Sequence, residues 1–156
     1  MNQPPIEPMP VMVPYHDNEF AMSLMIPAIW EMEADGETLI FSSIFYGYED
    51  NYWDTSLMYA ESYNNGEYST LDQFIRELNA DQYYYQSEMV DINGQTAYIG
   101  DCVLDASNGE KIYNKVVAVQ TGSRLFALLF YSPEEYRDAA SIMFQEIINS
   151  LELGTR

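Results

Sequence analysis

The first 75 residues of the chain contain no lysine or arginine. Arg76 is the first basic residue, and 13 acidic residues precede it. Over all 156 residues, 25 Asp and Glu stand against 6 Lys and Arg, which gives a formal net charge of -19 at pH 7. A protein with this charge repels nucleic acid and anionic membrane surfaces, and it attracts basic proteins or cations. The composition therefore predicts a basic protein partner and argues against direct binding of nucleic acid.

Cysteine and histidine are nearly absent, which removes several kinds of chemistry. The single cysteine, Cys102, excludes an internal disulfide and a cysteine-based zinc cluster. It falls in the middle of an expected strand, where a small core side chain is a better interpretation than a reactive thiol. The only histidine, His16, lies in a proline-rich lead-in and gives little support for a catalytic Ser–His or Cys–His pair.

Motifs of catalysis and cofactor binding are missing too. The chain has no G-x-S-x-G elbow, no G-x-G-x-x-G loop and no Walker loop. Paired carboxylates are plentiful, but nothing in the sequence sets the fixed separation that a glycosidase needs. No run of 18 apolar residues is present, so we expect no membrane span. We expect a protein that is not an enzyme and has no cofactor.

The residues that are abundant indicate a folded domain. Hydrophobic residues make up 47% of the chain and aromatic residues 15%, too much for a disordered acidic chain. Five prolines predict that residues 1–15 form an extended lead-in or tether, and residues 16–153 are expected to form a single domain. If Met1 is the native start, the protein is cytoplasmic. If Met1 follows a removed signal or lipid anchor, the domain is tethered outside the cytoplasm.

The pattern of apolar residues predicts seven strands and two helices. The strands are expected at 20–26, 38–46, 55–63, 82–92, 95–105, 111–121 and 124–131. One helix is expected at about 70–80, and a second is expected to start at Ser132, with Glu135 completing a capping box, and to end at Gly154. Asn93-Gly94 predicts a tight hairpin turn. The fold class is α+β, an α/β/α sandwich with a largely antiparallel sheet of about six to seven strands and two main helices.

Four segments resemble motifs of the PsbP/Mog1-like superfamily (DUF1795 type). Phe20–Trp30 is similar to its F-S-I-x-x-P-x-x-W opening, and Thr70–Phe74 resembles its T-L-D-x-F helix start. Ile92–Tyr98 is similar to its v-n-G-x-x-A-y hairpin, and Phe144–Leu151 resembles its closing f-x-x-I-x-x-S-f helix. The motifs occur in the family's order and cover about 20–151. Each motif alone consists mostly of core and turn residues.

The resemblance implies an α/β/α sandwich and a non-enzymatic role, and it transfers no catalytic residue. Members of the superfamily serve as photosystem subunits, binders of a small GTPase, bacterial lipoproteins and chaperones for secreted effectors. The resemblance does not name a partner, because one fold is used with different surfaces. The acidic first half is not a general trait of the family.

The segment 45–54 is the candidate contact surface, because it combines five aromatic and three acidic residues between two strands. Aromatic anchors bury much area with few rotatable bonds, and acids around them steer a basic partner. The anchors would be Tyr46, Tyr48, Tyr52 and Trp53, and the steering rim would be Glu49, Asp50 and Asp54. The alternative is that these rings pack on the sheet. Trp30 is expected to be a core residue beneath the first helix.

Calcium is the one cation that the sequence brings into consideration. Glu49, Asp50 and Asp54 place three carboxylates in a short loop, and carboxylate oxygens suit Ca²⁺. The EF-hand spacing D-x-D-x-D-G is absent, so a solvated loop is the simpler interpretation.

Three functions from different classes remain open. The first, which we favour, is a non-enzymatic binding module of accessory, adaptor or chaperone type that recognises a basic partner. The second is an acidic inhibitor that mimics nucleic acid, which needs carboxylates about 6–7 Å apart along one face. The third is an extracytoplasmic lipoprotein domain that binds a cation or a surface ligand. The sequence leaves the oligomeric state open.

Overall fold

A computed structural model describes residues 9–36, 38–43, 52–53, 55–64, 71–80, 86–121 and 124–154. The strands are β1 (Met12–Asp17), β2 (Met22–Pro27), β3 (Trp30–Asp35), β4 (Thr38–Ser43), β5 (Leu57–Asn64), β6 (Gln86–Ile92), β7 (Gln95–Asp105), β8 (Lys111–Thr121), β9 (Arg124–Pro133) and β10 (Glu152–Leu153). The helices are α1 (Leu71–Ala80) and α2 (Arg137–Asn149), and the 3-10 turn η1 (Glu134–Tyr136) leads into α2. Neither helix is long and apolar enough to cross a membrane.

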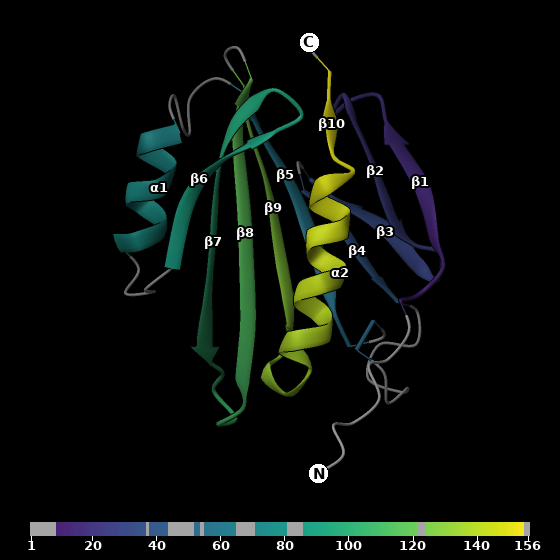
Figure 1. The fold of residues 1–156 in the computed structure, drawn as a ribbon, viewed down its shortest axis with the longest axis vertical. Coiled ribbons are helices and arrows are strands. Elements are labelled where there is room, and N and C mark those ends of the chain that lie inside the picture. The colour runs from purple at the N-terminus through teal and green to yellow at the C-terminus, as the bar shows by residue number, and fades with distance from the viewer. Residues whose placement is uncertain are drawn as a thin grey trace.

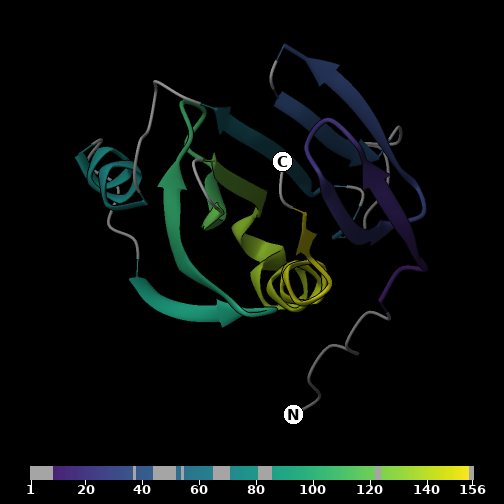
Figure 2. The ribbon, with the colours of Figure 1, turned by 90° about the horizontal axis from the view of Figure 1, so that it is seen from above.

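The strands form two sheets (Figure 1). The large sheet has seven strands in the order β3-β4-β5-β9-β8-β7-β6, and the small sheet has the order β1-β2-β10. Every pairing is antiparallel. Figure 2 shows the large sheet curving around α2, while α1 lies on the outer side of the sheet. The α/β/α arrangement and the largely antiparallel sheet predicted from the sequence are confirmed.

The centre of the large sheet is buried on both faces. Phe126, Leu128 and Phe130 of β9 belong to the core beneath α2, whereas Leu125 and Ala127 belong to a second cluster beneath α1. Successive strand residues point to opposite faces, so a strand covered on both sides must be almost continuously apolar. This explains the apolar run in β9, within the strand predicted at 124–131.

The predicted hairpin turn and the closing helix are also present. Asn93 (φ 48°) and Gly94 (φ 87°) both have positive φ, as a tight hairpin turn of the primed type requires. In α2, Ala140, Met143 and Ile147 are fully buried and form one apolar stripe of the helix.

The start of the second helix differs from the prediction. Ser132 and Pro133 are the last residues of β9, and Ser132 Oγ donates its hydrogen bond to the carbonyl oxygen of Pro133 at 3.0 Å. No side chain caps η1 or α2. The capping-box pattern with Glu135 was therefore a false signal, because the strand continues through the expected cap. The helix ends at Asn149, and Glu152–Leu153 forms β10 instead of a last helical turn.

Besides β10, two strands were not predicted from the sequence, β1 and β3. β1 pairs with β2 from Met12↔Pro27 to Asp17↔Met22, so residues 12–15 belong to the small sheet and not to a tether. An edge strand tolerates the proline at position 14, because the proline costs no hydrogen bond on the unpaired side. β3 was overlooked because five of its six residues are exposed. A sequence pattern finds a strand more readily when one face of it is buried.

Trp30 is a core residue, as expected, and is 5% exposed. It does not lie beneath α1, however. Trp30 belongs to the core cluster on the α2 side of the sheet, whereas Phe74 of α1 belongs to the other cluster. The predicted position of Trp30 was therefore wrong, although its burial was right.

Candidate partner-binding surface

One half of the outer sheet face is not covered by α1. The helix packs through Leu71, Phe74 and Ile75 onto β7, β8 and β9. Ten helical residues extend for about 15 Å, whereas a ten-residue strand extends for about 33 Å. The helix is therefore too short to cover the strands along their whole length. Figure 2 shows no described helix over the outer side of β4 and β5.

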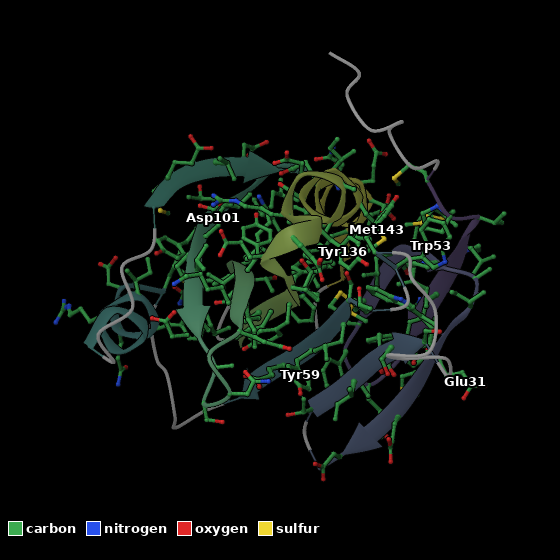
Figure 3. All side chains as sticks on the ribbon, turned by 90° about the horizontal axis from the view of Figure 1, so that it is seen from below. Glu31, Trp53, Tyr59, Asp101, Tyr136 and Met143 are labelled. Carbon is green, nitrogen blue, oxygen red and sulfur yellow. The ribbon has the colours of Figure 1, made fainter. Side chains whose placement is uncertain are left out.

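We call this part of the sheet, which no described helix covers, the open face. Its residues come from alternate positions of five strands: Glu31, Glu33 and Asp35 of β3, Thr38, Ile40 and Ser42 of β4, Leu57, Tyr59 and Glu61 of β5, Tyr131 of β9 and Ile112 of β8. Met58 and Ala60 are buried in the α2-side core, so Tyr59 between them must point outward. Figure 3 shows the Tyr59 side chain directed away from α2.

The centre of the open face is apolar and aromatic. Ile40 lies opposite Tyr59, and Leu57 lies opposite Tyr131. The rings of Tyr59 and Tyr131 meet edge to face, with their centroids 5.6 Å apart and their planes at 72°. All four side chains are partly exposed. An exposed patch of this composition is the kind of surface that binds proteins.

A hollow of about 390 Å³ opens beside this pair of rings. Its apolar lining comes from Leu57, Tyr59, Ile112, Tyr131 and Pro133. The polar groups at the hollow are Thr55, Ser132, Glu110 and Lys111. The volume lies in the range of small-ligand pockets, about 300–1,000 Å³. The hollow is therefore large enough for one long side chain of a partner.

Acidic side chains border the open face. Glu31, Glu33 and Asp35 are exposed and occupy alternate positions of β3, an edge strand. Glu61 lies opposite Thr38, next to them on the same face. Residues two apart on a strand are separated by about 6.8 Å. The border is thus a regular row of carboxylates beside an apolar centre.

Lys111, at the hollow, is already paired with a carboxylate. Its Nζ lies 2.8 Å from Oδ1 of Asp105, and both side chains are exposed. The hydrogen bond and charge of Asp105 raise the pKa of Lys111, and the charge of Glu134 adds a smaller contribution. Lys111 therefore does not make this end of the open face basic.

The residues predicted as the contact surface are only partly described. Tyr46, Tyr48, Glu49, Asp50 and Asp54 lie outside the described residues. Their roles in partner binding and in a calcium loop therefore stay predictions.

The two described members of that segment are Tyr52 and Trp53. Tyr52 is 1% exposed, and its hydroxyl donates to Sδ of Met9 at 3.6 Å. Its ring meets Trp53 edge to face at 5.0 Å, and Trp53 is half-buried against the same core. In this structure Tyr52 is thus a core residue, as the alternative interpretation had it, and Trp53 offers a partner only part of its ring.

The residues that the sequence did not single out are Ile40, Leu57, Tyr59 and Tyr131. The alternation in 55–63 predicted a strand, but it did not show which half of the strand would face solvent. Tyr131 is the last residue of the strand predicted at 124–131, and it does not belong to the cluster beneath α1.

His16 forms a small polar site away from the open face. Its Nδ1 lies 2.7 Å from Oγ of Ser23, the residue opposite it on β2, and its Nε2 lies 2.7 Å from Oδ1 of Asn18. The ring is exposed, and its contacts are one cross-strand partner and one local partner two residues later. Within the described ranges, no group of three His, Cys, Asp or Glu side chains is arranged to hold a metal ion.

A buried polar cluster lies between the sheet and the start of α2. Tyr113 Oη donates to Oδ2 of Asp101 at 3.2 Å, and Arg137 lies 5.0 Å above the Tyr113 ring. Burial raises the pKa of Tyr113. Lys115 is only 8% exposed, and burial lowers the pKa of its ammonium group, although the charges of Asp101 and Glu88 oppose this shift. Figure 3 shows Asp101 on the sheet beside α2, far from Tyr59.

No family model matches the sequence, and no curated protein matches it. Solved structures match the fold. Cyanobacterial PsbP (CyanoP) from Synechocystis has a TM-score of 0.68 and 14% identity, over 99% of this chain and 98% of that chain. A candidate regulator of unknown function from Pseudomonas aeruginosa has a TM-score of 0.60 and 14% identity, over 93% and 97%. LpqN of Mycobacterium tuberculosis, involved in cell envelope biogenesis, has a TM-score of 0.57 and 11% identity, over 90% and 89%. At these identities the likeness establishes the fold, and the chain has the PsbP-like fold that the sequence motifs indicated.

Proposed function

We propose that this protein is a non-enzymatic binding module that holds a basic protein partner on the open face. The observation that carries the proposal is the apolar centre formed by Ile40, Leu57, Tyr59 and Tyr131 beside a row of carboxylates. Aromatic side chains at the centre of a contact supply most of the binding energy, and charges at its border steer the partner and set the association rate. The net charge of -19 makes a basic partner the complementary one.

The descriptions of two proteins with this fold name neither a reaction nor a partner. LpqN is involved in cell envelope biogenesis, and the Pseudomonas protein is a candidate regulator. The shared fold does not select a partner, because partners are chosen by the surface that each protein places on it.

The size of the open face favours a transient complex. Neighbouring strands lie about 4.8 Å apart and rise about 3.3 Å per residue, so this part of the sheet measures roughly 400 Å². A stable complex usually covers about 800 Å² on each partner. We therefore expect a weak complex and an association rate that falls as salt rises.

A capture experiment with matched variants tests this proposal. The apolar variant is Ile40→Ser with Tyr59→Ser, and its control is Ile142→Ser with Met89→Ser, two apolar residues that are 54% and 53% exposed elsewhere. A protein captured from lysate by the wild type should be lost by the apolar variant and kept by the control. The proposal would be contradicted if the apolar variant still captured this protein, or if the apolar variant and the control variant lost it equally.

A charge-matched pair of variants tests the acidic border. Glu31→Gln, Glu33→Gln and Asp35→Asn neutralise β3, while Glu135→Gln, Asp138→Asn and Glu146→Gln remove three exposed charges on η1 and α2. With the captured protein in a stopped-flow assay, the β3 variant should slow association at low salt more than the control does. Equal slowing would mean that only the net charge matters.

The row on β3 also favours a second candidate, an inhibitor that mimics nucleic acid. Three acidic residues on the same face have backbone positions about 6.8 Å apart, which is compatible with the spacing that such a mimic needs. This function predicts that the captured protein is a nucleic-acid enzyme. Its capture should be lost in the β3 variant and at high salt, and it should be unchanged in the apolar variant.

A further inference from the structure

The hollow beside Tyr59 and Tyr131 has the chemistry of a site for a cationic side chain. We propose that it binds an arginine side chain of the partner, which rests on the proposed function and deepens it. The first support is geometric. The two rings stand at 72° with centroids 5.6 Å apart, so at least one of them can turn part of its face toward the hollow that both line.

The second support is the chemistry of the lining. Aromatic faces attract cations, and arginine is the side chain most often found over them. Its guanidinium group is planar and weakly hydrated, so it stacks on a ring more readily than the ammonium group of lysine does. Leu57, Ile112 and Pro133 form an apolar wall beside the rings. This wall suits the methylene stem of a long side chain.

The third support is the balance of charge around the hollow. Glu110 lines it, and Asp105 and Glu134 both act on Lys111, the one cation among the lining residues. This end of the open face therefore holds three carboxylates against one ammonium group, and a negative charge of about two remains locally. An incoming guanidinium group would find this charge beside the rings, and the carboxylate of Glu110, a lining residue, could accept its hydrogen bonds.

Model ligands separate the arginine site from an apolar site of the same shape. We would titrate ¹⁵N-labelled full-length protein with N-acetyl-glycyl-arginyl-glycinamide and follow the backbone amide signals. Matched peptides carry lysine or norleucine in place of arginine. We expect the arginine peptide to shift the amides of Tyr59, Glu110 and Tyr131, the lysine peptide to shift them less, and norleucine least. Equal shifts with norleucine, or no shifts with arginine, would overturn the inference.

Two conservative variants identify the groups responsible. Tyr59→Leu keeps an apolar side chain on β5 but removes the ring, and it should weaken arginine binding about two- to five-fold while leaving norleucine binding unchanged. Glu110→Gln should weaken arginine binding by a similar factor, whereas Glu152→Gln, a carboxylate outside the hollow, should not. The arginine peptide binds elsewhere if Tyr59→Leu affects arginine and norleucine binding alike and if Glu110→Gln behaves like Glu152→Gln.

A failure of the arginine site can be distinguished from a failure of the proposed function. If the apolar variant Ile40→Ser/Tyr59→Ser loses the captured partner while the arginine peptide shows no binding, the open face is a binding surface without an arginine site. If the arginine peptide binds at the hollow while the apolar variant captures the partner as well as the wild type does, the arginine site exists and the proposed function is wrong.

Discussion

The indole Nε1–H of Trp30 donates a hydrogen bond of 2.8 Å to the backbone carbonyl oxygen of Trp53. This bond ties the start of β3 to a segment 23 residues later in the chain. Tyr52, next to the accepting residue, is buried in the same core. The described end of the segment 45–54 is therefore anchored in the molecule, whatever its other residues contact.

The first prediction concerns this hydrogen bond. Trp30→Phe keeps an aromatic ring in the core but leaves the carbonyl group of Trp53 without this donor, and it reduces the packed volume. We expect the free energy of unfolding to fall by about 1–3 kcal/mol, measured by urea denaturation with fluorescence or circular dichroism. An unchanged midpoint would mean that the bond contributes nothing to stability.

The second prediction separates core from contact roles in the segment 45–54. Tyr52→Ala removes a ring that is 1% exposed and should lower the free energy of unfolding by about 3–5 kcal/mol. Trp53→Ala removes a half-buried ring and should lower the free energy of unfolding by a smaller amount. Thermal unfolding of the two variants checks this order. If Tyr52→Ala is as stable as the wild type, its ring is not part of the core.

The third prediction concerns the thiol of Cys102. The residue is 8% exposed, and its Sγ lies 3.8 Å from Oδ1 of Asn114, a buried side chain. A thiol that a reagent cannot reach does not react, so a disulfide reagent such as DTNB should label it only very slowly in the folded protein. In denaturant one thiol per chain should react at once. Fast labelling under native conditions would show that this strand opens or that the thiol is activated.

The fourth prediction concerns pH and Lys115. Burial places the folded-state pKa of Lys115 below its ordinary value of 10.5, so the unfolded chain binds this proton more tightly. The charged Lys115 therefore lowers the free energy of unfolding. This loss of stability is fully present below the folded-state pKa, and it disappears as pH rises toward 10.5. Lys115→Met should therefore be most stabilising, relative to the wild type, at neutral pH.

Urea titrations of both proteins between about pH 7 and 9.5 measure this difference, and they stay below the ordinary range of tyrosine ionisation. The stability gained by Lys115→Met should shrink as pH rises. Tyr15 and Tyr113, whose pKa values are raised, are present in both proteins and cancel. A difference that is constant with pH would contradict the assignment.

The fifth prediction compares two buried tyrosine hydroxyls. The hydroxyl of Tyr98 makes no hydrogen bond to any described residue, whereas that of Tyr113 donates to Asp101. Tyr98→Phe removes an unsatisfied polar group and should be neutral or stabilising by about 1 kcal/mol. Tyr113→Phe should destabilise by a similar amount. Equal effects from the two changes, measured by thermal unfolding, would show that both hydroxyls are equally well paired.

The sequence predicted the elements that have a buried side or a specific turn. The pattern of apolar residues predicted a helix at about 70–80, where α1 lies, and Asn93-Gly94 predicted the β6–β7 hairpin. The prediction from the sequence failed at β3, where exposed residues follow Trp30, and at β1, where Pro14 was taken for part of a tether. Both strands lie at sheet edges, where burial and proline rules are weakest.

The candidate site was harder to predict for a geometric reason. Tyr59 and Tyr131 are 72 residues apart in the sequence, and they meet only because β5 pairs with β9. Their exposure depends on where a helix from elsewhere in the chain ends. A local pattern records neither the pairing of distant strands nor the reach of a helix. The segment 45–54 was predicted as the contact surface because its aromatic and acidic residues lie close together in the sequence.

The exposed strand β3 has a further consequence for how copies of this protein behave together. An edge strand offers unpaired backbone groups to any strand of similar length, including its own equivalent in a second molecule. In an antiparallel pairing of two such strands, Glu33 would face Glu33 and Glu31 would face Asp35, so like charges oppose each other. The same three side chains that are proposed to attract a partner would therefore oppose the pairing of two copies through this edge.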